Sequence, residues 1–256
     1  MFRTLKTLIK RSPIAPFAAF VYGLALPPAR REILLQGLRY DRQTLQVMRR
    51  HLREESSCID IGANEGEILR HMTKLSPRGR HVAFEPIPRL AAKLQENFPG
   101  VAVHEAACGD RSGVADFVVV ENAPAYSGLR QRIYDRPDAK LNTIQVRVVR
   151  VDDLVTHPVA FIKIDVEGGE YHALLGAERT ISTSRPVIVF EAGAKGAGQY
   201  GVGAEDFASF FDRLGYRLST MDRWLASRPA LTREEFVDNW HRGGDFYFIA
   251  SPALSS

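Results

Sequence analysis

Cysteine, tryptophan and methionine are scarce in this 256-residue chain, which contains two, two and four of them. Cys58 and Cys108 stand alone, with no CxxC pair and no Cys/His cluster that has the spacing of metal ligands. The sequence therefore gives no sign of a structural zinc site or of a disulfide framework. We expect both cysteines to be reduced, half-buried thiols.

The chain also lacks a strong charge of one sign. Its 34 basic and 30 acidic residues give a net charge of +4 and a pI near 9.1, and both kinds are spread along the sequence. The sequence shows no stripe of basic residues of the kind that follows a row of phosphates, so we expect no nucleic-acid partner. With 45% hydrophobic and 25% charged residues, the composition is that of a globular protein of enzyme size.

The apolar segment near the N-terminus is too short to cross a membrane. Residues 13–26 are largely apolar but are interrupted by Pro16, whereas a spanning helix needs roughly 20 apolar residues. Three interpretations stay open: a signal peptide with LPPA as a poor cleavage site, an amphipathic segment on a membrane surface, or a helical cap packed on the domain. The segment is preceded by a basic region, which contains Arg3, Lys6, Lys10 and Arg11.

Beyond this extension, β-rich runs alternate with helical patterns. The run CIDIG at 58–62 is followed by apolar residues at helical spacing, and HVAFEP at 81–86 is followed by a second such pattern. Further strands are expected at 101–107, 115–120, 143–151, 159–167 and 186–193, with YRLSTM and DFYFIA completing the sheet. Such alternation predicts a doubly wound, mostly parallel α/β sheet. Since no internal repeat or low-complexity linker is present, we expect a helical extension over 1–45 and one domain over 46–256.

Acidic residues follow the predicted strands. In open α/β sheets the ligand lies beyond the carboxyl ends of the strands, so these side chains should meet at one edge. A pocket lined by carboxylates suits a ligand that carries hydroxyls and positive charge. The residues are Asp60, Glu85, Asp110, Asp165, Glu167 and Glu191.

The glycine loop after the first strand disfavours a phosphate ligand. The dinucleotide pattern G-x-G-x-x-G is absent, because the chain reads Gly62-Ala-Asn-Glu-Gly66. Glu65 also falls at the helix N-terminus, where an anion would bind. A ligand with a cationic centre, an ammonium group and a ribose diol fits better, and S-adenosylmethionine is such a ligand.

The run DIGANEGEI at 60–68 resembles the first motif of Rossmann-like methyltransferases, and its D-x-G-A-N-x-G form is similar to that of the FkbM-type family. Other segments resemble the family in the same order, over roughly residues 56–250. They are FEPIP (84–88), AACGDRSG (106–113), VDDL (151–154), FIKIDVEGGEYHALLGA (161–177), RPVIVFEAG (185–193) and FYFI (246–249). Val151 stands where the family commonly has leucine. The resemblance implies a class I methyltransferase fold, S-adenosylmethionine as cofactor and a cytoplasmic enzyme, with membrane association as an alternative.

The resemblance also assigns cofactor contacts. The loop under the methionyl and ribose parts would consist of Asp60, Gly62, Asn64 and Gly66. Glu85, followed by Pro86, would accept both ribose hydroxyls. Ala107, Cys108 and Asp110 would flank the adenine, and Asp165 would lie beside the sulfonium.

Methyl transfer to a hydroxyl also needs a base. The candidates are Asp165, Glu167, His172 and Glu191. We prefer Asp165 or Glu167, and we expect Lys163 to face away from the pocket. Asp165, Glu167 and Glu191 could instead hold a divalent cation, which we do not favour because no Asn or His completes the set.

The acceptor is not named by the sequence. The family's range implies a small molecule, a sugar or a lipid-linked glycan as the substrate of an O-methyltransferase. The polar stretch 121–142 could face a sugar or an anionic acceptor, or could be a solvated hairpin loop; its aromatic and basic residues are Tyr126, Arg130, Arg132, Tyr134 and Arg136. N-methylation, a nicotinamide-dependent oxidoreductase and a noncatalytic S-adenosylmethionine-binding protein are the alternatives. The oligomeric state is not predicted.

Overall fold

A computed structural model describes residues 28–131 and 138–253 of the chain. The chain divides into two compact units, Met1–Gln43 and Thr44–Ser256, which are described separately. The described part of the first unit belongs to helix α3 (Pro28–His51), which continues into the second unit. Within the described residues, no helix combines the length and the apolar character that a membrane span requires. The apolar segment 13–26, interpreted as a signal peptide, a membrane-surface segment or a helical cap, lies outside the described residues, as do Arg132, Tyr134 and Arg136.

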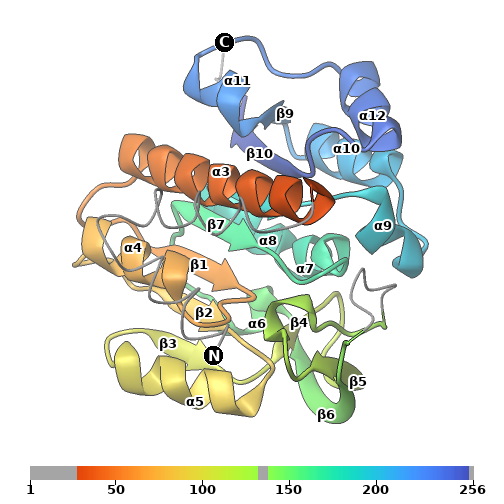
Figure 1. Cartoon of the computed structure of the whole chain (residues 1–256). Coiled ribbons are helices and arrows are strands. Elements are labelled where there is room, and N and C mark those ends of the chain that lie inside the picture. The colour runs from red at the N-terminus through yellow and green to blue at the C-terminus, as the bar shows by residue number, and fades with distance from the viewer. Residues whose placement is uncertain (1–27, 132–137, 254–256) are drawn as a thin grey trace. The chain divides into compact units, whose positions relative to one another are not determined.

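The second unit is built on a seven-stranded sheet with the strand order β3-β2-β1-β7-β8-β10-β9 (Figure 1). The strands are β1 (Cys58–Ile61), β2 (Val82–Phe84), β3 (Ala102–His104), β7 (Phe161–Ile164), β8 (Val187–Glu191), β9 (Tyr216–Thr220) and β10 (Tyr247–Pro252). Strands β3, β2, β1, β7 and β8 run parallel to one another, and β10 is antiparallel to both β8 and β9. The predicted mostly parallel α/β sheet is confirmed.

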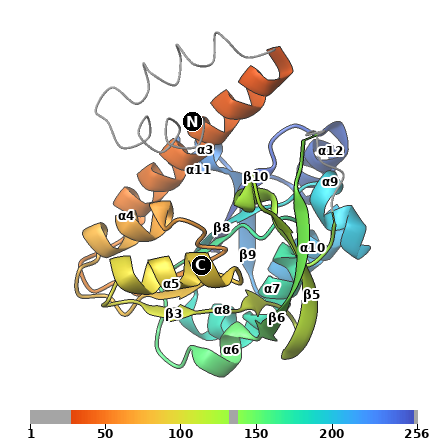
Figure 2. The same cartoon turned by 60° about the horizontal axis from the view of Figure 1, so that its bottom comes forward.

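Helices cover both faces of this sheet, so the predicted double winding is also confirmed. On one face, α4 (Glu67–Leu75) buries Leu69 and Met72, and α5 (Pro88–Asn97) lies beside it (Figure 2). The other face forms the main core with α7 (Glu170–Gly176), α8 (Glu178–Ser184) and α10 (Ala204–Arg213). The aromatic residues Phe207, Phe210 and Phe211 of α10 are buried there. The short α6 (Val151–Leu154), α9 (Ala194–Ala197), α11 (Met221–Leu225) and the longer α12 (Arg233–Arg242) complete the helices described.

A second, three-stranded sheet has the order β4-β6-β5. It consists of β4 (Ala107–Cys108), β5 (Gly113–Val120) and β6 (Leu141–Val149), and β5 and β6 form an antiparallel hairpin. The prediction of one strand over 101–107 is wrong, because the Ala106 N–H turns back to the His104 carbonyl at 2.9 Å and the chain leaves the central sheet. Asp110, which follows β4, therefore does not follow a strand of the central sheet.

The register of the central sheet gathers polar side chains at its carboxyl edge. Asp60 on β1 pairs with Lys163 on β7, and Glu191 on β8 pairs with Tyr247 on β10. Side chains two residues apart on a strand share a face, so Asp165 follows Lys163 on the same side. The sequence alternation thus brings these five side chains to one face of four neighbouring strands.

Both cysteines are free, and both are more deeply buried than expected. Cys58 is fully buried in β1 and Cys108 is 3% exposed in β4. Burial raises the pKa of each thiol, so both stay protonated and unreactive at neutral pH.

Candidate functional site

The glycine loop after β1 is held in place by backbone contacts. Gly62 and Ala63 both donate N–H bonds to the Phe84 carbonyl, at 3.0 and 3.1 Å, which ties the loop to the end of β2. Gly62 and Asn64 have φ values of +81° and +48°, a left-handed conformation that glycine and asparagine adopt most readily. The loop is thus a fixed element between the first two strands.

The two glycines are required by neighbouring protein atoms. A Cβ on Gly62 would come within 2.0 Å of the Asp165 carbonyl oxygen, and a Cβ on Gly66 within 2.6 Å of the Phe98 ring. Both positions also have positive φ values. These contacts explain the glycines without a ligand, and a close approach of the loop backbone to a cofactor stays a prediction.

Glu85 is fixed directly beside this loop. Its Oε2 accepts the Asn64 N–H at 2.8 Å and its Oε1 accepts the Ile87 N–H at 2.9 Å, across the intervening Pro86. The residue is 4% exposed. Burial raises the pKa of Glu85 to about 7, although the two backbone bonds oppose the shift. Each carboxylate oxygen keeps a further lone pair, so Glu85 is oriented and can still accept two hydroxyls.

Lys163 lies at the centre of the carboxylates, so the expectation that it faces away is wrong. Its Nζ is 3.7 Å from Asp60 Oδ1 and 3.4 Å from Asp165 Oδ2, and it donates to the Gly62 carbonyl at 3.1 Å. The side chain is buried because β7 is covered on both faces, and it meets Asp60 across the parallel pair. Burial raises the pKa of Asp60, against the opposing effect of Lys163.

Asp165 is held from three sides. The Tyr247 hydroxyl donates to its Oδ2 at 2.5 Å, and Lys163 and Glu191 also contact the carboxyl group. Burial would raise the pKa of Asp165, but the Lys163 charge and these hydrogen bonds outweigh it and lower the pKa below the ordinary value. Asp165 is therefore a fixed anion and a weak base.

Three of the four predicted base candidates come together. Asp165, Glu167 and Glu191 each place a carboxylate oxygen within 4.8 Å of the others. Such a set could hold a divalent cation or share protons. His172, the fourth candidate, is not part of this group; it lies on α7, and its ring centroid is 5.6 Å from that of Tyr200.

The turn that carries Glu167 is built by its own sequence, DVEGGE. Glu167 and Gly168 have φ values of +63° and +112°, which reverses the chain after β7. Glu170, 1% exposed, accepts the Val166 and Gly168 N–H groups with its Oε1, each at 3.0 Å. Burial raises the pKa of Glu170 to about 7. The buried carboxyl group therefore fixes the turn that presents Glu167.

Two segments outside the central sheet reach this turn. Gly128, in the stretch after β5, has the Cβ and the carbonyl oxygen of Glu167 3.6 Å from where its own Cβ would stand. Arg130 donates to the Gln199 carbonyl at 3.1 Å and places its guanidinium 5.1 Å from the centre of the Tyr200 ring. The same ring packs on Gly168. The insertion and the 3-10 turn at Gly198–Tyr200 thus meet beside Glu167.

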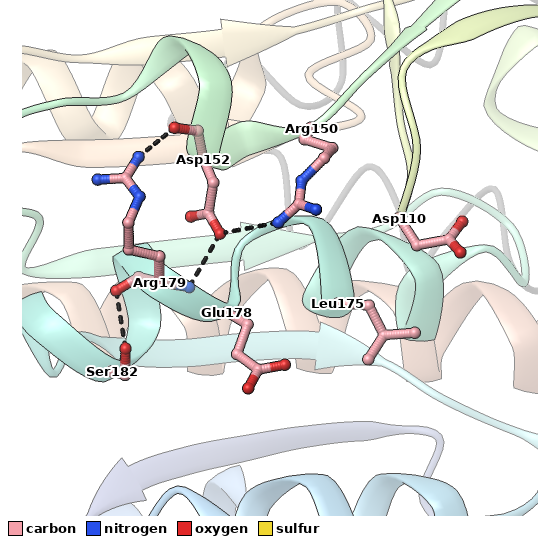
Figure 3. A pocket seen from close by; sticks show the side chains of 7 residues that line it. All are labelled: Asp110, Arg150, Asp152, Leu175, Glu178, Arg179 and Ser182. Carbon is pink, nitrogen blue, oxygen red and sulfur yellow. Dashed lines mark hydrogen bonds and ion pairs between the residues drawn. The ribbon is translucent and has the colours of Figure 1, made fainter.

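Asp110 lies in a different place from the other predicted cofactor residues. It lines a shallow pocket of about 470 Å³ together with Arg150, Asp152, Leu175, Glu178, Arg179 and Ser182 (Figure 3). None of the other predicted site residues lines this pocket. The role of Asp110 at the adenine stays a prediction.

The charges of this pocket have structural partners. Asp152 accepts the backbone N–H groups of Arg179 and Thr180, both at 2.9 Å, and the Thr180 hydroxyl at 2.8 Å. These N–H groups belong to the first turn of α8 and have no partner within the helix. The VDDL segment therefore caps α8, with Arg150 3.4 Å from the same carboxylate.

Ala107 and Cys108 are core residues. Ala107 packs in a small apolar cluster with Ile87, Leu90 and Phe117, and Cys108 belongs to the main core. Their side chains stabilise β4, and any contact with adenine would come from the backbone around them.

Lys163, Glu170 and Tyr247 are the residues of this site whose roles the sequence analysis missed. Glu170 could have been found from the DVEGGE turn, because a carboxylate that follows two glycines often binds their N–H groups. The contacts of Lys163 and Tyr247 depend on strand order and register, which one sequence does not reveal.

The model of the methyltransferase FkbM domain matches residues 60–218, more than half of the chain. The chain is 26% identical over 176 residues to the 2-O-methyltransferase NoeI of Sinorhizobium fredii, covering 59% of this chain and 70% of that protein. It is 27% identical over 148 residues to Methyltransferase 1 of Beauveria bassiana, covering 49% and 59%. The solved structure of methyltransferase FkbM from Methylobacillus flagellatus is 20% identical, with a TM-score of 0.49, over 78% of this chain and 44% of that one.

Family membership implies the use of S-adenosylmethionine. The side chains at the carboxyl edge suit that cofactor chemically, because the carboxyl groups of Asp60, Asp165 and Glu85 lie around the Lys163 ammonium and can accept hydrogen bonds from hydroxyl and ammonium groups. The match covers the glycine loop, Glu85 and the DVEGGE turn, which are the elements that the structure brings together. The chain is a methyltransferase and belongs to the FkbM methyltransferase family.

Proposed function

We propose that this protein transfers the methyl group of S-adenosylmethionine to a hydroxyl group of a small molecule, a sugar or a lipid-linked glycan. The observation that carries this proposal is the carboxylate cluster around Lys163, beside the carboxyl group of Glu85. The relative named a 2-O-methyltransferase supports transfer to oxygen rather than nitrogen. Cytoplasmic location, peripheral membrane contact and the division at residue 45 stay predictions.

Each cofactor contact is assigned to residues that the fold already fixes. Glu85 binds the ribose hydroxyls, since its two oxygens are oriented by Asn64 and Ile87. The loop from Gly62 to Gly66 contacts the methionyl part, and Asp165 lies at the sulfonium. When bound, S-adenosylmethionine supplies a methyl group on a positively charged sulfur, so the protein needs to align the acceptor and remove its proton.

Glu167 is the base that we favour among the four candidates. Asp165 is a fixed anion with a lowered pKa, and it accepts a hydrogen bond from Tyr247. Glu191 contacts Asp165, and His172 is not part of the group that the three carboxylates form. Glu167 stands on the turn where Gly128 and the Tyr200 segment meet, which is where an acceptor can approach the carboxyl edge of the sheet.

The acceptor side combines a cation, an aromatic ring and carboxylates. Arg130 offers N–H donors at the Tyr200 ring, which packs on Gly168 of the same turn as Glu167. This arrangement suits a polyhydroxylated acceptor because sugars present both hydroxyl donors and oxygen acceptors. A divalent cation held by Asp165, Glu167 and Glu191 is the second mechanism, in which the metal rather than a free carboxylate acidifies the hydroxyl. We do not favour it, since no histidine or cysteine among the described residues joins these three carboxylates.

The test is methyl transfer to a panel of methyl glycosides, read by mass spectrometry, with wild type, Glu167→Gln and Glu121→Gln. Glu121 is an exposed carboxylate at the end of β5 and serves as the matched control. We expect wild type and Glu121→Gln to methylate at least one glycoside, and Glu167→Gln to lose roughly 100-fold or more in rate. Full activity in Glu167→Gln would refute its role as base, and loss of wild-type activity with EDTA would favour the metal mechanism.

A further inference from the structure

Tyr247 connects β10, the last described strand along the chain, to the predicted cofactor site. It lies on β10 directly opposite Glu191 of β8, and its hydroxyl crosses to Asp165 at the end of β7. Because the acceptor is an ionised carboxylate, the bond from Tyr247 Oη to Asp165 Oδ2 is a charge-assisted hydrogen bond. A residue some 80 positions along the chain therefore fixes the orientation of Asp165.

Asp165 has a competing partner on its other side. Lys163 Nζ is 3.4 Å from the same oxygen, Oδ2, and is also 3.7 Å from Asp60 and 3.1 Å from the Gly62 carbonyl. Without the Tyr247 hydroxyl, the Asp165 carboxylate would lose one of its three partners and could turn further toward Lys163 and form a closer pair with it. The tyrosine hydroxyl thus keeps the Asp165 carboxylate from pairing more closely with Lys163, and the carboxylate stays directed toward the open carboxyl edge of the sheet.

We propose that Tyr247 is a positioning residue whose hydroxyl holds the Asp165 carboxylate at the sulfonium end of the cofactor site, so that the protein prefers the cationic donor over its neutral product. This inference rests on the proposed function. Donor and product differ at this position by one methyl group and one positive charge. A carboxylate aimed at the sulfur therefore acts on the donor alone, and it also favours release of the product after transfer.

The test is titration calorimetry of S-adenosylmethionine and S-adenosylhomocysteine with wild type, Tyr247→Phe and Tyr216→Phe. Tyr247→Phe removes only the hydroxyl. Tyr216 is the matched control, because its buried hydroxyl also makes a hydrogen bond, to the Pro186 carbonyl at 3.0 Å, away from the carboxylates. We expect Tyr247→Phe to weaken donor binding about tenfold while product binding changes by less than about twofold. Tyr216→Phe should leave the ratio of the two affinities at its wild-type value.

A second pair of variants covers the case in which Tyr247→Phe folds poorly. Asp165→Asn keeps an oxygen that can accept from Tyr247 but removes the charge, so it should lower the preference for the donor by a similar factor. In the Asp165→Asn background, Tyr247→Phe should no longer change the ratio of affinities. The inference would be overturned if Tyr247→Phe left the ratio of the two affinities unchanged, whether it weakened the binding of both ligands equally or of neither. Failure of folded wild type to bind either ligand would instead refute the proposed function.

Discussion

Gly62 and Asp165 touch so closely that a single methyl group on Gly62 would stand 2.0 Å from the Asp165 carbonyl oxygen. The two residues belong to the ends of neighbouring parallel strands, β1 and β7, and the Asp165 N–H donates to the Ile61 carbonyl at 3.1 Å. The glycine loop and the Asp165 carboxylate are therefore positioned as one unit. A change in either element should disturb both.

The first prediction separates the steric role of Gly62 from its conformation. Gly62→Ala adds a clash with backbone to a φ of +81°, whereas Gly201→Ala meets no atom within 4 Å but has a φ of +72°. Gly100→Ala has neither problem. We expect Gly201→Ala to lose about 1 kcal/mol of unfolding free energy and Gly62→Ala clearly more, on the order of 3 kcal/mol. Urea unfolding measures both. Equal losses in Gly62→Ala and Gly201→Ala would show that the close contact with Asp165 is wrong.

The second prediction concerns Glu85. Glu85→Ala should weaken S-adenosylhomocysteine binding by about 1–3 kcal/mol, because the ribose hydroxyls and the Asn64 N–H both lose their acceptor in a partly dry site. The control is Glu96→Ala, an exposed glutamate on α5. Calorimetry gives both affinities. Wild-type affinity in a folded Glu85→Ala variant would exclude Glu85 from the cofactor site.

The third prediction follows from the pKa of Glu170, which burial raises from 4.5 to about 7. Between these two pH values the folded protein binds more protons than the unfolded chain, so the contribution of Glu170 to stability falls as the pH rises through this window. Glu170→Gln keeps an oxygen that can accept both backbone N–H groups, since both bonds go to Oε1. The substitution removes the buried charge.

Glu170→Gln should therefore be more stable than wild type at pH 8, by at most about 3 kcal/mol, and nearly equal to it at pH 4.5. Urea unfolding at four pH values tests this. Glu85 contributes a similar slope in both proteins, because burial also raises its pKa to about 7. A difference between the two proteins that does not change with pH would contradict the assignment.

The fourth prediction assigns a structural role to the pocket in Figure 3. Asp152→Ala should lower the unfolding free energy by about 2–4 kcal/mol, because the first turn of α8 and the Thr180 hydroxyl lose their acceptor. Asp153→Ala, at the next and exposed position, should change it by less than about 0.5 kcal/mol. The folded Asp152→Ala protein should bind S-adenosylhomocysteine normally. Weakened binding would place this pocket in the cofactor site.

The sequence predicts the parallel part of the fold well, because each strand there is a short apolar run followed by a helix with one apolar face. The strands expected at 58–62 and 159–167 contain β1 and β7, which are buried at every position. Between residues 101 and 149 the strands expected at 115–120 and 143–151 are present as β5 and β6, but the single strand expected at 101–107 is divided into β3 and β4. There the chain leaves the central sheet at Ala106 and forms a separate hairpin, and local pattern does not tell which sheet a strand joins.

The candidate site is predictable where residues follow one another along the chain. Asp60, Glu85, Asp165, Glu167 and Glu191 lie at the ends of central strands, as their positions after apolar runs indicate. Contacts between strands were not predictable. Lys163 becomes central only because β7 pairs with β1, and Tyr247 only because β10 lies antiparallel to β8.

The most direct test of the central claim is titration calorimetry of the purified, folded protein with S-adenosylhomocysteine, with NADH in parallel. The account predicts binding of S-adenosylhomocysteine and none of NADH, because the loop from Gly62 to Gly66 lacks the dinucleotide glycine spacing and the site around Lys163 is rich in carboxylates. Binding of neither ligand, or of NADH alone, would contradict it.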